Sequence, residues 1–471
     1  MVRIHSSELP EVYKRKSEES HSQYPHQLPS TSEHTIEDDY EELGLVRNLS
    51  LNHPSTITPL SPLEKWCMDM YKAHQVVPGS SWGSLPLTAR GEWKGKNCDH
   101  VVEKRDTVAS SSLPSDPGEQ KALCLNWHKQ YKVEGMNLKN LPQKLKVPWR
   151  HLHCSMKVWD QRYATIPLSS CYGENANNNN NNIDPEDESY EMISLLVAVT
   201  TRKMHHPAIE NLAIFHALLP SFIRTLDCGF KYSVVIGYDK GDQYFDKKEK
   251  REEVDVWFLK EVEQPLLERG ISVKLFFREV NNVQKKPGPV FNEMAREAYN
   301  NPKIKADFFF RVNDDSEILQ TWPRHYTNAL KALSPPLVGV VGPLCKQGNT
   351  RILTHDFTSR VHMYIFEENY YPPPLSDWWM DDWISLVYGS QRTFRTKKIE
   401  IVHHTGAHAT RYEVDQGHAK LLPNLVNNGK TKIANYMRKK KDVSEKTVSG
   451  FLNDRFNGPP FKDIPYQARR K

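Results

Sequence analysis

Long apolar runs are missing from this sequence. No window approaches a run of roughly eighteen apolar residues, the length that a helix needs to cross a bilayer. Residues 1–30, which begin MVRIHSSELPEVYKRKSEES, also lack the apolar core of a signal peptide. Both absences argue against a membrane-spanning or secreted protein. They predict a cytoplasmic protein by default, and one of the secretory pathway if the N-terminus is incomplete.

Cysteine is scarce, with seven residues scattered over 471 positions. An odd number at irregular spacing predicts reduced thiols rather than the disulfide framework of a small secreted domain. Four of them lie too far apart for the spacing of a zinc ribbon: Cys98, Cys124, Cys154 and Cys171. The sequence therefore predicts neither disulfides nor structural zinc.

A large excess of one charge is missing too. Lysine and arginine number 63 against 58 aspartates and glutamates, a formal net charge of +5. So small an imbalance does not indicate a nucleic-acid partner. One basic run stands at 430–441 (KTKIANYMRKKK). It fits a solvated helix face, or a peripheral contact with anionic lipid or an acidic partner.

Composition divides the chain into five segments. Residues 1–60 are polar and aperiodic, which predicts disorder, and residues 61–171 are an accessory region without clear periodicity. An asparagine run inside 172–190 marks a low-complexity acidic linker. Residues 191–425 form the predicted main domain, and residues 426–471 a basic C-terminal tail.

The main domain alternates between two kinds of apolar pattern. Continuous apolar runs predict buried strands at 193–199, 232–238, 271–277 and 306–312. Apolar residues at helical spacing predict helices over 209–222, 249–268 and 291–299. Such alternation predicts an α/β fold with a mainly parallel sheet flanked by helices. Ligands of such sheets gather at the carboxyl ends of the strands.

The fourth predicted strand runs into a group of oxygen side chains, in FFFRVNDDSEIL. Asn313, Asp314 and Asp315 could begin the next helix, because Asp and Asn are good helix caps. They could instead hold a cation, since adjacent carboxylates repel one another unless a cation or protons intervene. The stretch alone does not choose between these two interpretations.

Two later motifs add acids and imidazoles. In SDWWMDDWISLVYG (376–389), Asp381 and Asp382 stand in the first turn of a predicted helix. They are either favourable partners of the helix dipole or a functional pair. A short strand at 399–402 then delivers His403 and His404. Because side chains alternate along a strand, only one of the two histidines can face the site.

These motifs in this order resemble the GT-A fold of nucleotide-sugar glycosyltransferases of the Asp-x-Asp type, with Asn313 in the place of the first acid. The resemblance implies a GT-A-like domain behind a long irregular N-terminal extension. It implies bound Mn²⁺ or Mg²⁺, with Asp315 as the main ligand and Asn313 as a further one. Asp314 and Asn313 would also lie near the sugar and ribose, and His403 or His404 would complete the metal's protein ligands.

The resemblance also implies a catalytic base and a set of donor contacts. Asp382 is the first choice for the base and Asp381 the second; in a retaining reaction Asp382 would position the acceptor instead. The implied donor contacts are Thr200, Thr201, Asp239, Asp242, Asn292 and Arg296. A turn explains Asp239 and Asp242 almost as well, and a surface salt bridge explains Arg296.

The leading hypothesis is a metal-dependent glycosyltransferase. It would move a sugar from a nucleotide-sugar donor, UDP-linked by expectation, to a hydroxyl of a carbohydrate, glycoprotein or glycolipid. A nucleotidyltransferase or phosphohydrolase with the same Asp and His residues is an alternative, although TTRKMHHP after the first strand has no glycine. A non-catalytic carbohydrate-binding relative is another.

Overall fold

The computed structural model describes most of the chain from residue 190 onward and parts of the region before it. The described residues are 61–74, 89, 92, 96, 98, 114, 116–131, 141, 145, 149, 152, 154, 190–204, 207–347, 349–404, 411–412 and 414–464. The segment predicted to be disordered, 1–60, and almost all of the predicted linker, 172–190, lie outside them.

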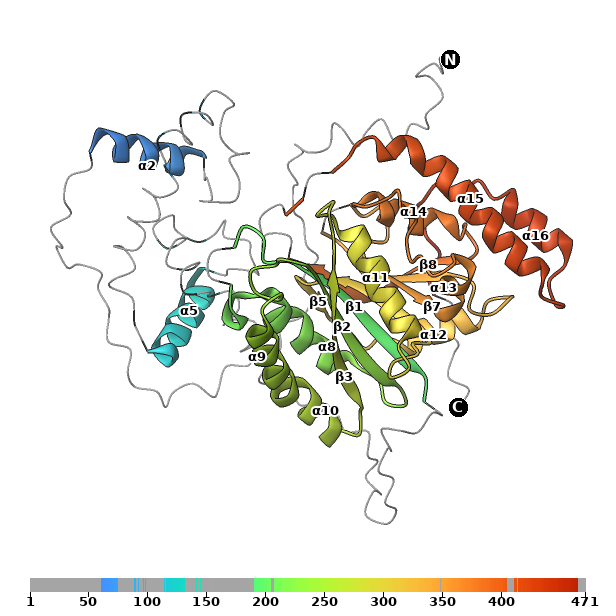
Figure 1. Ribbon diagram of the computed structural model, residues 1–471, viewed down its shortest axis with the longest axis horizontal. Helices are drawn as coiled ribbons and strands as arrows, with labels where there is room; N and C mark the ends of the chain where they lie inside the picture. Colours follow the sequence, from blue (N-terminus) through green and yellow to red (C-terminus); the bar gives the residue numbers. More distant parts are fainter. Residues whose placement is uncertain are drawn as a thin grey trace, which may run out of the picture. The chain divides into compact units, whose positions relative to one another are not determined.

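One eight-stranded sheet organises the C-terminal part of the chain, with the strand order β3-β2-β1-β4-β7-β6-β8-β5 (Figure 1). Its strands are β1 (Met192–Val199), β2 (Lys231–Asp239), β3 (Val273–Val280), β4 (Phe308–Asn313), β5 (Ser316–Ile318), β6 (Val340–Cys345), β7 (Asp356–Ser359) and β8 (Thr393–His403). Strands β3, β2, β1 and β4 are mutually parallel. Strand β7 is antiparallel to β4 and β6, and β5 is antiparallel to β8, so the sheet is mixed.

Helices cover both faces of the parallel half. On β2, Val234 and Ile236 belong to a core shared with the helices that follow β1 and β2. Gly237 points to the opposite face because side chains alternate along a strand. There it meets α11 so closely that an added Cβ would lie 2.5 Å from Met294. Helix α11 (Pro287–Asn300) lies across β1 and β2 in Figure 1.

The helices on the first face are short and contain π turns. After β1 come a 3₁₀ turn (Ile209–Asn211), a π turn (Ile214–Leu218) and α8 (Leu219–Thr225). After β2 come α9 (Lys248–Phe258), a π turn (Leu259–Glu263) and α10 (Gln264–Glu268). Pro265 accounts for the second π turn, since proline has no N–H to give to the regular helical ladder. Helix α12 (Pro323–Lys331) packs on β6 and β7.

The structure confirms the four predicted strands of the parallel half and the helices between them. It departs from the prediction after Asp315, where the chain forms β5 and not a helix. The helix-start interpretation of Asn313 to Asp315 is therefore wrong, because the next helix, α12, begins only at Pro323. The expectation of a mainly parallel sheet holds for β1 to β4 and fails for β5 and β7.

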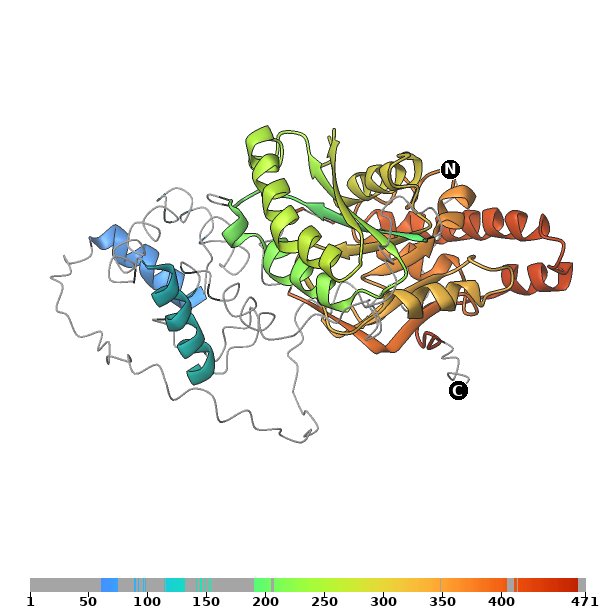
Figure 2. The same ribbon diagram turned by 90° about the horizontal axis from the view of Figure 1, so that it is seen from below.

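The C-terminal segment forms two helices, α15 (His418–Arg438) and α16 (Glu445–Leu452). They lie side by side, and α15 packs against α14 (Trp379–Val387), as Figures 1 and 2 show. Gly429 permits this packing, since an added Cβ would lie 2.5 Å from Val387. The boundary predicted between 425 and 426 falls inside α15, and Lys430 of the basic run is buried.

The N-terminal described residues include α2 (Pro62–His74) and α5 (Pro117–Tyr131). Two disulfides, Cys67–Cys98 and Cys124–Cys154, close loops around these helices. Cys228 is disulfide-bonded as well, and Cys345 is a buried free thiol. The prediction of reduced thiols was wrong because disulfide formation depends on proximity in space; the paired Cα atoms lie 5.3 and 5.0 Å apart.

Among the residues that the structure describes, no helix is both long enough and apolar enough to cross a membrane.

Candidate functional site

Three parallel strands end side by side at one edge of the sheet. Strands β1, β2 and β4 are parallel neighbours, so the residues that follow them meet at one edge. Asp239 closes β2, and Asn313 closes β4 directly before Asp314 and Asp315. Strand β8 runs antiparallel to β5 and brings His403 opposite Ser316. The motifs that are distant in sequence thus converge through the order of the strands.

Asp315, His403 and Asn313 form a direct chain of contacts. The imidazole Nε2 of His403 lies 3.0 Å from Asp315 Oδ1 and 3.2 Å from Asn313 Nδ2. Burial opposes the charged imidazolium, but the hydrogen bond and charge of Asp315, with further acids nearby, raise the pKa of His403 above its ordinary value. Asp315 and His403 are therefore positioned to share a proton or a cation.

His404 faces a different partner from His403. Its Nε2 lies 3.0 Å from Glu317 Oε2, and both side chains are buried. Its backbone N–H donates to the carbonyl of Asp315 at 2.8 Å. His403, the last residue of β8, thus lies against Asp315, and His404, the residue after it, lies against Glu317.

Asp314 is paired with an arginine from the segment after β8. Arg411 donates from Nη1 to Asp314 Oδ2 at 2.7 Å and from Nη2 to Oδ1 at 2.8 Å. The backbone carbonyl of Arg411 accepts from Arg202 at 2.9 Å, and Arg202 also donates to Asp239 at 2.6 Å. Arg202 thus joins the end of β2 to Arg411, and Arg411 in turn binds Asp314 after β4.

Asp381 and Asp382 lie in the first turn of α14, and both are buried. Asp381 Oδ1 accepts a hydrogen bond from Arg311, a β4 residue that is 1% exposed. Burial is the main cause that raises the pKa of Asp381 to about 7; Arg311 opposes the shift, and Asp356 and Asp382 add to it. Arg311 Nε also lies 3.1 Å from Asp356 Oδ2.

Acids of both groups act electrostatically on His403. Asp315, Asp314 and Asp381 all contribute to the raised pKa of His403. Tyr412 is affected by Asp381 in the same way, and burial together with that charge raises the pKa of Tyr412 to about 12. We call Asn313, Asp314, Asp315, Asp381, Asp382, His403 and Arg411 the acid–histidine cluster.

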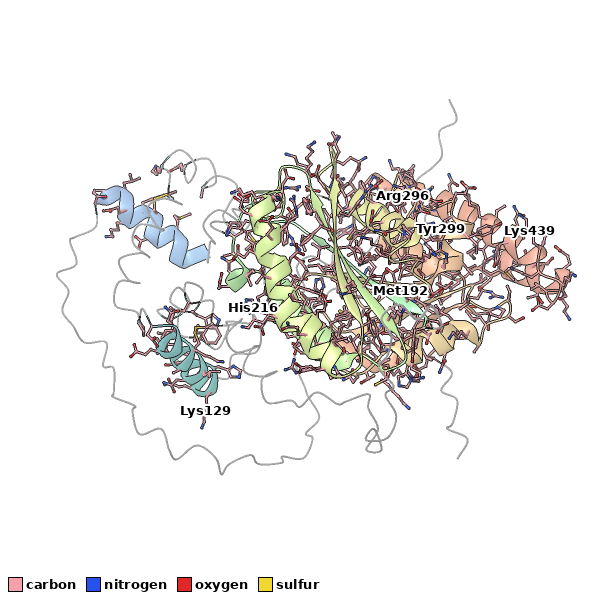
Figure 3. The ribbon with its side chains drawn as sticks, turned by 60° about the horizontal axis from the view of Figure 1, so that its bottom comes forward. Lys129, Met192, His216, Arg296, Tyr299 and Lys439 are labelled. Carbon is pink, nitrogen blue, oxygen red and sulfur yellow. A yellow bond between two sulfur atoms is a disulfide. The ribbon has the colours of Figure 1, made fainter. Side chains whose placement is uncertain are left out.

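Two of the residues that were predicted to contact the nucleotide-sugar donor instead hold α11 against the segment that precedes α14. Asn292 donates to the carbonyl of Tyr371 at 3.1 Å and accepts from its N–H at 2.8 Å. Arg296, labelled in Figure 3, donates to the carbonyl of Glu368 and to Asn369. Both also line a cavity of about 450 Å³, together with residues of β3 and α11 such as Arg278 and Glu293, and no residue of the acid–histidine cluster lines it.

Two others build the turn after β2. Asp242 accepts from the N–H of Thr201 at 2.8 Å and from its hydroxyl at 2.7 Å. It also accepts from the backbone N–H groups of Tyr244 and Phe245. These contacts agree with the alternative interpretation, in which Asp242 builds a turn. Asp239 is held by Arg202 and by Asn282 at 2.8 Å, and burial raises its pKa. Thr200 offers its carbonyl to Arg411 at 3.5 Å.

A divalent cation at this site would have two protein ligands, which is fewer than a complete coordination shell needs. Within the described part of the chain, no three His, Cys, Asp or Glu side chains are arranged to hold a metal ion. Both oxygens of Asp314 accept from Arg411. Asp315 and His403 remain, an oxygen and a nitrogen donor of the kinds that Mn²⁺ accepts. Such a pair fits an ion that completes its shell with water and phosphate oxygens.

The sequence interpretation did not identify Arg311, Arg411 or Arg202. One signal pointed to Arg311, because a charged residue inside an apolar run of a strand that is buried on both faces must have a buried partner. Nothing in the local sequence marked Arg411, whose contact with Asp314 spans 97 residues.

Comparison with known proteins gives little further information. No protein-family model matches the chain, and no curated protein matches it in sequence. Among solved structures, it is similar to the crystal structure of S. aureus TarS 1-349 in complex with UDP, at 12% identity over 55% of this chain and 69% of that chain. The TM-score of 0.28 is too low for this likeness to carry an argument.

Proposed function

We propose that this chain is a glycosyltransferase that moves a sugar from a nucleotide-diphosphate sugar to an acceptor hydroxyl. One observation carries the proposal. Acids from two different elements, Asp314 and Asp315 after β4 and Asp381 of α14, raise the pKa of the same histidine, His403, at the carboxyl edge of parallel strands. That edge is where α/β sheets bind nucleotides.

Asp315 and His403 are the residues that would hold Mn²⁺ or Mg²⁺, and Asn313 supports the ring of His403 from 3.2 Å. When bound, the cation would supply positive charge to the diphosphate leaving group. Arg411 would supply a second, permanent positive charge beside it, because its guanidinium lies in the same cluster. His404 is left out of this ligand set because it pairs with Glu317.

The proton acceptor for the hydroxyl belongs to the Asp381–Asp382 pair. Asp382 is the first choice, and it stands in the first turn of α14 beside Asp381. Asp381 remains the second choice, since a pKa of about 7 suits a base that works near neutral pH. If the reaction retains configuration, the pair would orient the acceptor instead.

The donor would lie over the ends of β1 and β2. Thr200 and Asp239 stand at this edge, and Arg202 and Arg411 join them to the acid–histidine cluster. We assign Asp239 to the ribose or base of a donor such as a UDP-sugar. Asn292 and Arg296 are omitted, since their polar atoms serve the packing of α11.

We also propose that the protein works in an oxidising compartment such as the secretory pathway. The two disulfides and the bonded Cys228 support this, since disulfides are rare where glutathione and thioredoxin keep thiols reduced.

The test is donor turnover by the purified, oxidised chain. A panel of nucleotide sugars is incubated with and without Mn²⁺, and released nucleoside diphosphate is measured. We expect Mn²⁺-stimulated release that Asp315→Ala abolishes and that Glu445→Ala, a change at an exposed acid of α16, leaves unchanged. No release from any donor would overturn the proposal. Release of inorganic phosphate or pyrophosphate from nucleotides instead would favour a phosphohydrolase or nucleotidyltransferase.

A further inference from the structure

The segment directly before β7 is joined to the helix that carries Asp381. The N–H of Leu353 donates at 2.7 Å to Ser385 Oγ, and that hydroxyl donates at 2.6 Å to the carbonyl of Asp381. The next carbonyl, that of Thr354, accepts from Arg311, whose guanidinium binds the carboxylate of Asp381. Two successive residues of this segment thus hold one side of the proposed site.

His355, the next residue, contacts the other side of the site. Its Nε2 lies 2.8 Å from the hydroxyl of Ser316, which directly follows Asp315 in the chain. Its ring stands edge-to-face with the ring of His403, at 83° and with 5.5 Å between the centroids. Ser316 and His403 lie opposite one another on β5 and β8. His355 therefore contacts both members of the strand pair that brings Asp315 and His403 together.

His355 is a costly residue to keep in a protein interior. The side chain is 1% exposed, and its Nδ1 is buried with no hydrogen-bond partner among the described residues. A buried nitrogen without a partner loses its hydration and gains nothing in return. Exceptions of this kind in native proteins call for an explanation, and a role in a functional site is one of them. The two contacts that His355 does make both lead to the proposed cation site.

Asp315 and His403 must keep a fixed geometry if they are to share a cation. They lie 3.0 Å apart but on different elements, since Asp315 precedes β5 and His403 ends β8. Metal-binding imidazoles and carboxylates depend on neighbouring side chains that hold their orientation. Mutation of such neighbours typically costs about 10–100-fold in metal affinity or activity.

We propose that His355 is a positioning residue of the cation site. Its hydrogen bond to Ser316 fixes the chain beside Asp315, and its edge-to-face contact fixes the rotation of the His403 ring. His355 is not itself a ligand, because no three His, Cys, Asp or Glu side chains of the described residues are arranged to hold an ion. The inference rests on the proposed function, since the ion is the one proposed for the transferase.

Two variants separate the two contacts of His355. His355→Gln keeps a polar group in the place of Nε2 and loses the ring, whereas His355→Phe keeps a ring and loses the hydrogen bond. We expect each to raise the Kd for Mn²⁺ about tenfold or more. Binding is measured on the full-length, oxidised chain from the electron paramagnetic resonance signal of free Mn²⁺. Ser316→Ala should match His355→Phe, and the double variant should be no weaker than either, because both changes remove one contact.

Stability distinguishes positioning from a merely structural role. Ser316→Ala combined with His355→Phe removes both polar partners and the unpaired nitrogen, and paired apolar replacement of this kind is nearly neutral or stabilising. The double variant should therefore keep its Tm while its Mn²⁺ affinity falls. His362→Gln is the matched control, since His362 is a fully buried histidine of α13 (Arg360–Ile365) with both ring nitrogens hydrogen-bonded. It should leave the Kd for Mn²⁺ unchanged.

Mn²⁺ binding is measured with and without UDP, so that the two proposals can fail separately. If the unaltered chain binds no Mn²⁺ under either condition, the proposed cation site is wrong and the role of His355 falls with it. If the unaltered chain binds Mn²⁺ and both His355 variants bind it equally well, only this inference is overturned. A Kd that rises only in step with a loss of Tm, or equally in His362→Gln, would show a structural role and overturn it too.

Discussion

The guanidinium of Arg411 holds the carboxylate of Asp314 in two parallel hydrogen bonds, at 2.7 and 2.8 Å. Paired geometry of this kind is stronger and more directional than a single ion pair. It places a permanent cation at the point where the resemblance to GT-A enzymes implies a metal. Two adjacent acids therefore differ: Asp314 is neutralised by Arg411, and Asp315 faces His403.

Arg411→Gln should increase the affinity for Mn²⁺ in the absence of nucleotide. Removal of the guanidinium takes away a competing positive charge and leaves Asp314 able to join Asp315. We expect a severalfold lower Kd, measured from the electron paramagnetic resonance signal of free Mn²⁺. Arg438→Gln, at an exposed arginine of α15, is the control and should have no effect. An unchanged or weaker Mn²⁺ affinity in Arg411→Gln would refute this assignment.

Arg311→Met should destabilise the fold strongly. Arg311 is buried between Asp356 and Asp381, so its loss leaves two buried carboxylates without a cation. Breaking a buried pair costs about 3–5 kcal/mol, whereas exposed pairs contribute about 1 kcal/mol or less. We expect that contrast between Arg311→Met and Arg438→Met in urea unfolding at pH 8. The loss in Arg311→Met should shrink toward pH 5, where Asp381, with its pKa of about 7, takes up a proton.

The sequence predicted the parallel half of the sheet because its strands are long enough to show a pattern. Strands β1 and β2 are continuous apolar runs with both faces buried. Strands β5 and β7 have three and four residues, too few for any period to be visible. Their place in the sheet depends on partners far along the chain, such as β8 for β5.

The acids and histidines of the site were visible in the sequence because they stand at strand ends or in a first helical turn. Their partners were not visible. The choice between His403 and His404 needed the register of β8 against β5, and the Arg411 contact needed the path of the chain after β8. Asn292 and Arg296 were expected to contact the donor, but their polar atoms bind the segment around Tyr371.

Gly288→Ala should destabilise the junction between α11 and the segment before α14. A Cβ at Gly288 would lie 2.7 Å from the Cα of Ser376 and 2.8 Å from the carbonyl oxygen of Leu375, so backbone would have to move. We expect a loss of about 1–3 kcal/mol in the free energy of unfolding. Gly450→Ala in α16 meets nothing within 4 Å and should be neutral or stabilising. Equal effects of the two changes would contradict this.

His362 should make the fold sensitive to mild acid. It is fully buried, its Nε2 lies 2.8 Å from the carbonyl of Tyr370, and its Nδ1 lies 2.7 Å from the hydroxyl of Tyr388. A carbonyl can only accept, so Nε2 carries the proton and Nδ1 accepts from Tyr388. Burial lowers the pKa of His362 to about 4, against an ordinary value of 6.5.

Above pH 6.5 the imidazole is neutral in both the folded and the unfolded chain, and its contribution to stability is complete. Between pH 6.5 and about 4, the unfolded chain takes up a proton that the folded chain does not, so stability should fall by about 3 kcal/mol. His362→Gln keeps a donor and an acceptor but does not titrate. Urea unfolding of both proteins from pH 8 to pH 4 should therefore show curves that converge as the pH falls. Parallel curves would mean that His362 is protonated in the folded protein as readily as in the unfolded one.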